Sequence, residues 1–234
     1  MKLGQVLFSQ GFGTRRDCAG LIHAGEVTLH GAVCDDPDQE VDPAGLEFGV
    51  QGETWPYRAT ALIALNKPAG RECSQKPKHH PSVYGLLPAP LRRRDVQAIG
   101  RLDEDTTGLL LFTDDGTLIH RWTSPKRHIP KVYDVTCKHP VDEALVARLR
   151  AGVVLLDGPE PVRAAECERT GEQTLSLTLT EGKYHQVKRM VAAAGNRVEA
   201  LHRSRYGTLA LPANLAPGAW CWLDGPAAVE PGAG

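Results

Sequence analysis

Three acidic side chains, Asp103, Glu104 and Asp105, stand together in the short polar stretch GRLDEDTTG. The apolar residues LLLF follow at once, so these carboxylates lie where a loop enters a buried strand. Backbone N–H groups and threonine hydroxyls can fix a carboxylate there, and a fixed carboxylate can act as a nucleophile or stabilise a cation. The same residues can also hydrogen-bond their own turn. The residues alone favour the turn and do not choose among the three acids.

A second candidate group is Lys188, in a segment that predicts a helix over residues 184–194. Val187 and Val191 share one face of this helix, and Lys188 lies one position round, at the edge of the buried face. A lysine in that position ordinarily extends its ammonium to solvent. Paired with a carboxylate instead, it would keep that carboxylate ionised.

Metal chemistry is not indicated by the cysteines and histidines. The six cysteines form no CxxC pair, and of the nine histidines only His79 and His80 are adjacent. This spacing argues against a zinc site and favours reduced thiols, several of them in the core. We therefore expect no zinc site.

Charge is distributed unevenly along the 234 residues. Residues 1–50 carry three basic and eight acidic side chains (net −5), residues 51–140 carry fourteen and nine (net +5), and residues 141–234 carry ten and eleven (net −1). Nucleic-acid contact needs clustered cations, so the middle third is the candidate for it. No apolar run reaches the roughly 20 residues that span a membrane. The N-terminus also lacks a signal-peptide pattern, so we expect a cytoplasmic protein.

The elements that would position these groups divide into two parts. The first part is predicted to contain helices over 2–10 and 14–24, a hairpin over 25–34 and a strand over 46–50. Thr14 is the expected N-cap of the second helix, with Asp17 as its capping-box partner and with Ala19 and Ile22 facing inward. Residues 51–58, which include a glycine and a proline, are expected to be a linker.

The second part alternates strands and helices. The apolar patterns predict strands over 61–65, 109–113, 131–137, 174–180, 198–205 and 219–223, and helices over 116–123, 142–151 and 184–194. This mixture predicts an α+β domain over 59–226 with a mixed, largely antiparallel sheet, followed by a disordered tail over 227–234.

Four motifs resemble those of the pseudouridine synthases that act on ribosomal RNA. They are GRLDEDTTGLLLFTDDG (100–116), NKPAG (66–70), KVY (131–133) and EGKYHQVKRM (181–190). The resemblance implies that Asp103 is the catalytic residue, that Tyr133 packs on the target base and that Lys188 is the basic partner of Asp103. It also implies a substrate pocket lined by Arg101, Leu102, Thr106 and Leu201.

The first fifty residues are similar to the alpha-L RNA-binding module, in which Arg15 and Arg16 would offer charge to phosphate beside a helix N-terminus. Gly4 stands where related modules usually have an aspartate. With EGKYHQVKRM, this module resembles the branch that modifies uridine 516 of 16S ribosomal RNA. The resemblance further implies a monomer that contacts RNA, without a cofactor, through Lys67, Arg121, Lys126, Arg127, Lys131, His185, Gln186 and Arg189.

Other functions stay open at this point. One is the same chemistry on large-subunit ribosomal RNA, and another is a non-catalytic RNA-binding factor for ribosome assembly. A glycosidase with paired carboxylates is remote, because no motif places a second acid.

Overall fold

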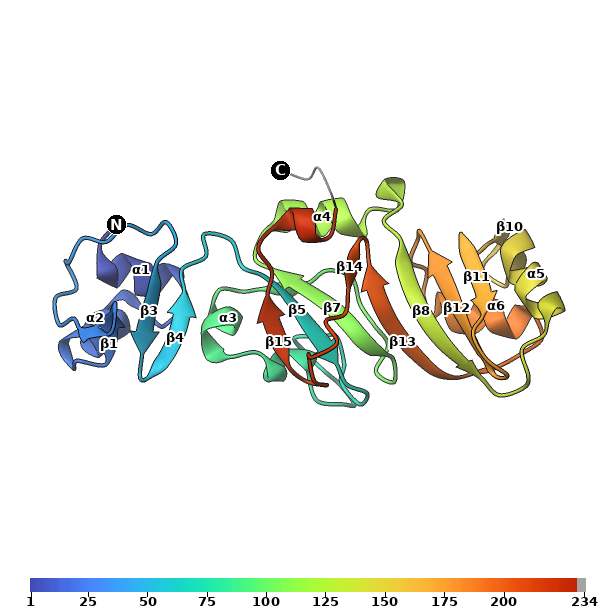
Figure 1. Ribbon diagram of the computed structural model, residues 1–234, viewed down its shortest axis with the longest axis horizontal. Helices are drawn as coiled ribbons and strands as arrows, with labels where there is room; N and C mark the ends of the chain where they lie inside the picture. Colours follow the sequence, from blue (N-terminus) through green and yellow to red (C-terminus); the bar gives the residue numbers. More distant parts are fainter. Residues whose placement is uncertain (231–234) are drawn as a thin grey trace. The chain divides into compact units, whose positions relative to one another are not determined.

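The computed structural model describes residues 1–230, which form two compact units (Figure 1). The N-terminal unit comprises Met1–Ala61 together with Leu87–Gln97, and the second unit comprises Leu62–Leu86 and the residues from Ala98 onward. We call the second one the catalytic unit, because the candidate catalytic residues Asp103, Tyr133 and Lys188 lie in it. Each unit is described by itself.

The N-terminal unit contains two short helices and a small antiparallel sheet. Thr14 and Asp17 form the predicted capping box, in which Asp17 N–H donates to Thr14 Oγ1 (3.2 Å) and Thr14 N–H donates to Asp17 Oδ2 (2.8 Å). Cys18 and Ile22 face the core, so the prediction of Ala19 as an inward residue was wrong by one position. The elements are α1 (Leu3–Ser9), α2 (Arg15–His23), β1 (Val27–Leu29), β2 (Ala32–Val33), β3 (Glu47–Val50) and β4 (Glu53–Pro56), in the strand order β2-β1-β3-β4.

Residues 51–58 differ from the expected linker, because β4 lies in them and pairs antiparallel with β3. Trp55 of β4 is buried, which gives this segment an apolar side chain to anchor it. A distant helix, α3 (Ala89–Arg93), also belongs to this unit: the following residue, Arg94, donates from Nη1 to Gln10 Oε1 (2.8 Å). The sequence pattern did not indicate this helix.

The catalytic unit is built on a mixed sheet in the order β11-β12-β8-β13-β7-β5-β15, with β14 pairing β13 and β6 pairing β7 (Figure 1). The pair β13–β7 is parallel, and the pairs β11–β12, β12–β8, β8–β13, β13–β14, β7–β5 and β5–β15 are antiparallel, as the predicted fold class requires. The strands are β5 (Leu62–Lys67), β6 (Gln97–Ala98), β7 (Thr107–Thr113), β8 (Lys131–Cys137), β9 (Val153–Leu155), β10 (Gly158–Val162), β11 (Glu166–Arg169), β12 (Thr174–Leu179), β13 (Val198–Tyr206), β14 (Leu209–Ala210) and β15 (Trp220–Trp222).

Two helices of the catalytic unit begin at side-chain caps that the sequence supplies. Asp115 accepts from Thr117 N–H (2.7 Å) at the start of α4 (Gly116–Thr123), and Asp142 accepts from Leu145 N–H (2.7 Å) at the start of α5 (Glu143–Ala151). α6 (Gln186–Ala193) begins two residues later than predicted, because His185 adopts a left-handed conformation (φ 47°). Three short 3₁₀ helices cover Val83–Leu86, Pro125–Arg127 and Pro226–Ala228.

The core explains why β5 and β7 are mostly apolar. β5 is buried over its whole length, and on one side of β5 and β7 the buried cluster includes Leu62, Leu109, Leu111 and Trp122. Leu175, Leu177 and Leu179 alternate inward along β12, as predicted. The sheet therefore sits between packed layers at its centre, which fixes the strands that carry the candidate site.

The predicted disordered tail differs from the structure over residues 227–230. Val229 is buried, and Glu230 accepts a hydrogen bond from Trp122 Nε1 (3.0 Å). Residues 231–234, which the same prediction covers, lie outside the described residues. The hairpin of β9 and β10 and the edge strand β11 were also not predicted, because their sequences lack a regular apolar alternation.

Candidate active site

One cavity of about 860 Å³ in the catalytic unit gathers the predicted chemistry-bearing residues. Its lining comes from the loop before β7, from β8 and β13 of the sheet, and from the loop that leads into α6. The residues predicted to be catalytic or to line the pocket all meet here: Asp103, Tyr133, Lys188, Arg101, Leu102, Thr106 and Leu201. Segments far apart in the sequence thus converge on one site.

Asp103 is held between two basic side chains. Lys188 Nζ lies 3.2 Å from Asp103 Oδ2, and His185 Nε2 lies 3.3 Å from Asp103 Oδ1. The Asp103 side chain is 27% exposed, whereas Glu104 is 44% and Asp105 is 57% exposed. Asp103 is thus the most enclosed of the three acids that the sequence could not separate.

Lys188 bridges two carboxylates, because its Nζ also lies 2.7 Å and 2.9 Å from the two oxygens of Asp105. Burial lowers the pKa of Lys188, but the hydrogen bond to Asp105 and the charge of Asp103 outweigh it and leave the pKa raised. Burial likewise raises the pKa of Asp105, but the hydrogen bond and charge of Lys188 leave it lowered. Lys188 and Asp105 therefore stay ionised at neutral pH.

Hydrogen bonds from Lys67 hold the loop that carries Asp103. This ammonium is fully buried and donates to the carbonyls of Pro68 (3.0 Å), Glu104 (3.0 Å) and Thr106 (2.8 Å). The prediction that Lys67 contacts RNA was therefore wrong for a physical reason, since its three donors are used inside the protein. Burial also lowers the pKa of Lys67.

The loop before α6 is held in a similar way by Gln186. This side chain is 5% exposed, its Nε2 donates to Glu181 Oε1 (2.8 Å) and its Oε1 accepts from Lys183 N–H (2.7 Å). The expected RNA contact of Gln186 is thus replaced by a loop-positioning contact. His185 stays accessible at the cavity and stacks on the exposed Tyr184 ring, with 3.8 Å between ring centroids.

The sheet side of the cavity is formed by β8 and β13. Tyr133 of β8 pairs in register with Arg203 of β13, and β7 approaches Arg203 from the other side at Gly108. A side chain at Gly108 would overlap the Arg203 backbone, and its φ of +102° favours glycine as well. Sequence reasoning missed Arg203, although its place two residues after Leu201 on a strand puts both on one face.

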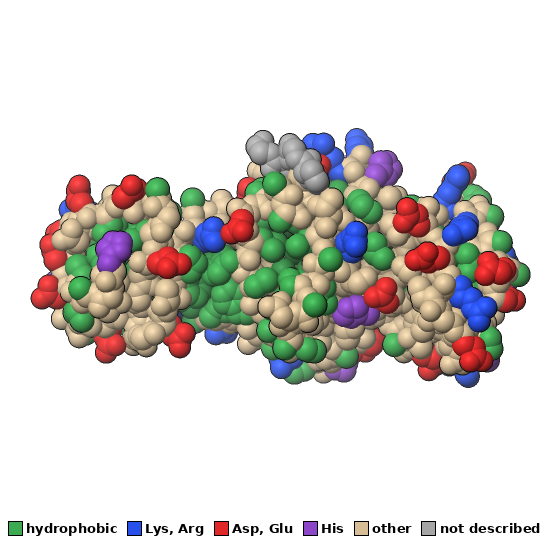
Figure 2. All heavy atoms as spheres, viewed as in Figure 1, with side chains coloured by type: hydrophobic (Ala, Val, Ile, Leu, Met, Phe, Trp, Pro, Cys, Tyr) green, Lys and Arg blue, Asp and Glu red, His purple; other side chains and the backbone are tan. Residues whose placement is uncertain are grey.

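The other predicted RNA-contacting residues are more dispersed. Arg121 pairs with Glu230, and Arg189 pairs with Asp157. The remaining ones differ in exposure: Lys131 is half-buried in the cavity, Lys126 and Arg127 are exposed in the loop after α4, and Arg15 and Arg16 are exposed at the start of α2. On the face shown in Figure 2, acidic side chains are spread over the N-terminal unit, in keeping with its net negative sequence.

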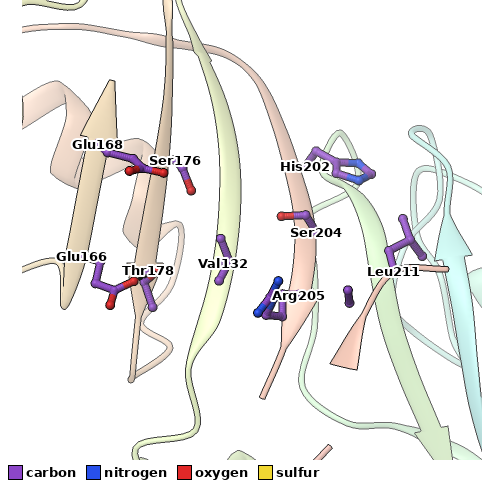
Figure 3. A pocket seen from close by; sticks show the side chains of 10 residues that line it. Val132, Glu166, Glu168, Ser176, Thr178, His202, Ser204, Arg205 and Leu211 are labelled. Carbon is purple, nitrogen blue, oxygen red and sulfur yellow. Dashed lines mark hydrogen bonds between the residues drawn. The ribbon is translucent and has the colours of Figure 1, made fainter. Parts of the chain in front are cut away.

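A second hollow, of about 510 Å³, lies on the opposite face of the same sheet. Figure 3 shows Glu166 and Glu168 of β11 on one side of Val132, with His202, Ser204 and Arg205 of β13 on the other. Its strand residues alternate with those of the first cavity, so the two sites use opposite faces. It lacks a carboxylate clamped by cations, and we therefore assign the chemistry to the first cavity.

Residues 1–230 contain no group of three or more His, Cys, Asp or Glu side chains arranged to hold a metal ion. All six cysteines are free thiols. In the same described part of the chain, no helix has both the length and the apolar character needed to cross a membrane.

Comparison with known proteins identifies the class. Residues 61–193 match the family model for RNA pseudouridylate synthase. A Haemophilus influenzae protein named ribosomal small subunit pseudouridine synthase A is 44% identical over 206 residues, covering 88% of each chain. A Bacillus subtilis protein named an uncharacterized RNA pseudouridine synthase is 38% identical, covering 93% of this chain and 92% of the relative.

A solved crystal structure of a pseudouridylate synthase is 35% identical, covers 95% of this chain and 96% of its own, and superposes with a TM-score of 0.67. The chain belongs to the RNA pseudouridylate synthase family. The predicted family, fold class and isomerase activity are thereby confirmed. The roles of individual residues remain predictions, and they are developed below.

Proposed function

We propose that this enzyme isomerises one uridine of small-subunit ribosomal RNA, uridine 516 of the 16S molecule, with Asp103 as the catalytic carboxylate. The observation that carries the residue assignment is the clamp on Asp103, which lies 3.2 Å from Lys188 and 3.3 Å from His185 at the wall of the cavity. The target assignment is supported by relatives named ribosomal small subunit pseudouridine synthase A.

The reaction breaks the bond between C1′ of the ribose and N1 of the uracil, turns the base and rejoins it through C5. The uridine of a folded RNA must first leave its stack, at a cost of a few kcal/mol. In this proposal Tyr133 stacks on the extruded base, and its position in the lining on the sheet side of the cavity supports that role. Asp103 meets the sugar and either bonds C1′ or stabilises the positive charge that develops there.

Lys188 acts on Asp103 in this scheme. Its ammonium lies between two carboxylates, Asp103 and Asp105, and offsets part of the repulsion between them. Lys126, Arg127 and Arg189 lie outside the cavity lining and are proposed to contact RNA phosphates, as are Arg15 and Arg16 in the N-terminal unit. We further propose that the enzyme acts as a cytoplasmic monomer.

Primer extension on carbodiimide-treated ribosomal RNA tests this proposal. RNA from cells that lack the protein should lose a single small-subunit stop, and a plasmid copy of the wild type should restore it. A copy carrying Asp103→Asn should fail to restore it, whereas Glu104→Gln should succeed, because Glu104 is exposed and faces His80. A lost stop in large-subunit RNA, or restoration by Asp103→Asn, would contradict the proposal.

A further inference from the structure

Arg203 is a buried cation that the scheme above does not use. Its side chain is 2% exposed, lines the cavity, donates from Nε to the Leu109 carbonyl (2.8 Å) and lies over the Tyr206 ring at 5.2 Å. Its buried Nη2 has no hydrogen-bond partner. Among residues 1–230, no carboxylate forms an ion pair with it. A buried, unpaired guanidinium is costly unless something else satisfies it.

Lys131 places a second cation on the same side of the cavity. It lies on β8 directly opposite Tyr206 of β13, its Nζ is 5.2 Å from the centre of the Tyr206 ring, and it donates to the Ile129 carbonyl (2.9 Å). Burial, with the charge of Arg203, lowers the pKa of Lys131 to about 8. No carboxylate of the described chain pairs with this lysine either. We call Lys131 and Arg203 the floor cations.

The floor cations and the Asp103 clamp are therefore opposites in charge balance. Asp103 and Asp105 both lie against Lys188, and His185 lies beside Asp103, whereas the floor cations repel each other and no carboxylate of residues 1–230 pairs with them. An incoming negative charge would remove this imbalance, and its binding would be strengthened by the low dielectric of the cavity. The arrangement indicates a site for an anionic or strongly hydrogen-bonding oxygen.

The strand register shows which part of the substrate reaches this site. Arg203 pairs directly with Tyr133, and Lys131 precedes Tyr133 on the same face of β8. A base stacked on Tyr133 therefore lies beside the floor cations. The hydroxyl of Thr106, also buried and without a hydrogen-bond partner, lines the same cavity. The ring of an extruded uridine carries two carbonyl oxygens, O2 and O4, into this region, while its phosphates stay with the chain outside.

We propose that Arg203 and Lys131 bind the carbonyl oxygens of the flipped uracil and stabilise the negative charge that the base acquires when it leaves the sugar. This inference rests on the proposed function, in which Asp103 serves the sugar. Arg203 and Lys131 are thus catalytic residues that act on the base, as donors aimed at developing charge.

The electron balance is as follows. When the C1′–N1 bond breaks, its electron pair stays on N1 and is shared with O2 and O4 by resonance, while C1′ becomes electron-poor and is met by Asp103. After the base turns, C5 forms the new bond to C1′. The proton on C5 is then lost to water and N1 takes up a proton from water, which leaves a neutral base. The floor cations hold the intermediate charge through hydrogen bonds and exchange no proton.

Single-turnover kinetics on a target-containing ribosomal RNA fragment tests the proposal with Lys131→Met and Arg203→Gln. We expect the rate constant to fall about 100-fold in each variant while RNA affinity changes by less than about threefold. Lys138→Met is the matched control, because Lys138 is exposed at the end of the same strand; it should keep the wild-type rate. Thermal unfolding checks the fold, and Lys131→Met alone decides if Arg203→Gln does not fold.

Substituted RNAs identify the atoms involved. Sulfur in place of O2 or O4 of the target uracil should slow the wild-type enzyme at one of these positions at least. In the variant that lacks the cation bound to that oxygen, the same sulfur substitution should lower the rate further by less than about twofold. Methylphosphonates at the two flanking phosphates should affect wild type and variants equally. If a methylphosphonate weakens RNA binding by the wild type but not by the Lys131 or Arg203 variant, the proposal is overturned, because the cations then bind phosphate.

The two proposals fail separately. If Asp103→Asn is inactive and both floor-cation variants turn over at the wild-type rate, only the present inference is wrong. If Asp103→Asn stays active, the proposed function is wrong.

Discussion

The two sides of the active-site cavity use charge in different ways. On the loop side, Asp103 and Asp105 both lie against Lys188, His185 lies beside Asp103, and buried side chains such as Lys67 and Gln186 hold the loops that carry them. On the sheet side, Lys131 and Arg203 stand on rigid strands without any anion from the described chain. The difference suggests that one side is complete before RNA binds and the other is completed by the substrate.

Removing the Lys67 ammonium should have the largest effect on the loop side. Lys67→Met keeps the volume but leaves the carbonyls of Pro68, Glu104 and Thr106 without their shared donor. Each of the three carbonyls left unsatisfied costs about 1–3 kcal/mol, and removing the buried charge offsets part of this cost. We therefore expect the free energy of unfolding to fall by about 4 kcal/mol. Urea titration measures it, with Lys138→Met as the neutral control. An unchanged midpoint would show that the loop does not depend on this lysine.

Removing Lys188 should separate its chemical role from folding. Lys188→Met leaves Asp103 and Asp105 facing each other without the bridging cation, so we expect the single-turnover rate to fall about 100-fold, about 2.7 kcal/mol in the barrier. Lys188→Arg retains the charge and should recover most of the rate. A full rate in Lys188→Met would contradict the claim that Asp103 needs the cation of Lys188 beside it.

On the sheet side, removing a cation should stabilise the fold. The pKa of Lys131 is lowered from 10.5 to about 8, so the folded state disfavours the charged form. The penalty is absent above pH 10.5, grows as the pH falls and is complete below about 8. We expect Lys131→Met to gain about 2–3 kcal/mol in the free energy of unfolding at pH 7, and to lose this advantage between pH 8 and 10.5. Urea titrations at several pH values test it, and destabilisation at pH 7 would contradict it.

Part of this contrast was visible in the sequence and part was not. Local signals predicted the capping box of Thr14 and Asp17 and the bounds of β8 and α4, because each depends on neighbouring residues. The pairing of Asp103 with Lys188 came only from motif resemblance, since the fold joins segments far apart in the chain.

Other features escaped the sequence because tertiary packing decides them. Lys67 and Gln186 were predicted to contact RNA, but both side chains are buried in the fold. Residues 227–230 were predicted to belong to a disordered tail, but Val229 packs into the core and Glu230 accepts a hydrogen bond from Trp122. No sequence pattern singled out Arg203, because what distinguishes it is a buried Nη2 without a hydrogen-bond partner, and only the folded structure shows that.

The smallest predicted effect concerns the N-terminal unit, whose sequence is net acidic. Arg15 and Arg16 are two exposed cations in an otherwise acidic segment. Replacing both with alanine should weaken RNA affinity by about threefold and reduce the salt dependence by the equivalent of about one or two phosphates, with the single-turnover rate unchanged. Filter binding at several salt concentrations measures this. A large loss of rate would show that this unit does more than bind RNA.

The central claim is that the loop side presents one reacting carboxylate, Asp103, among three neighbouring acids. Tritium release from RNA labelled at uracil C5 tests it most directly, with Asp103→Asn, Glu104→Gln and Asp105→Asn measured side by side. The structure predicts no release from Asp103→Asn, about tenfold slower release from Asp105→Asn because Lys188 loses its nearer partner, and wild-type release from Glu104→Gln. Release from Asp103→Asn at more than a trace level would contradict the account.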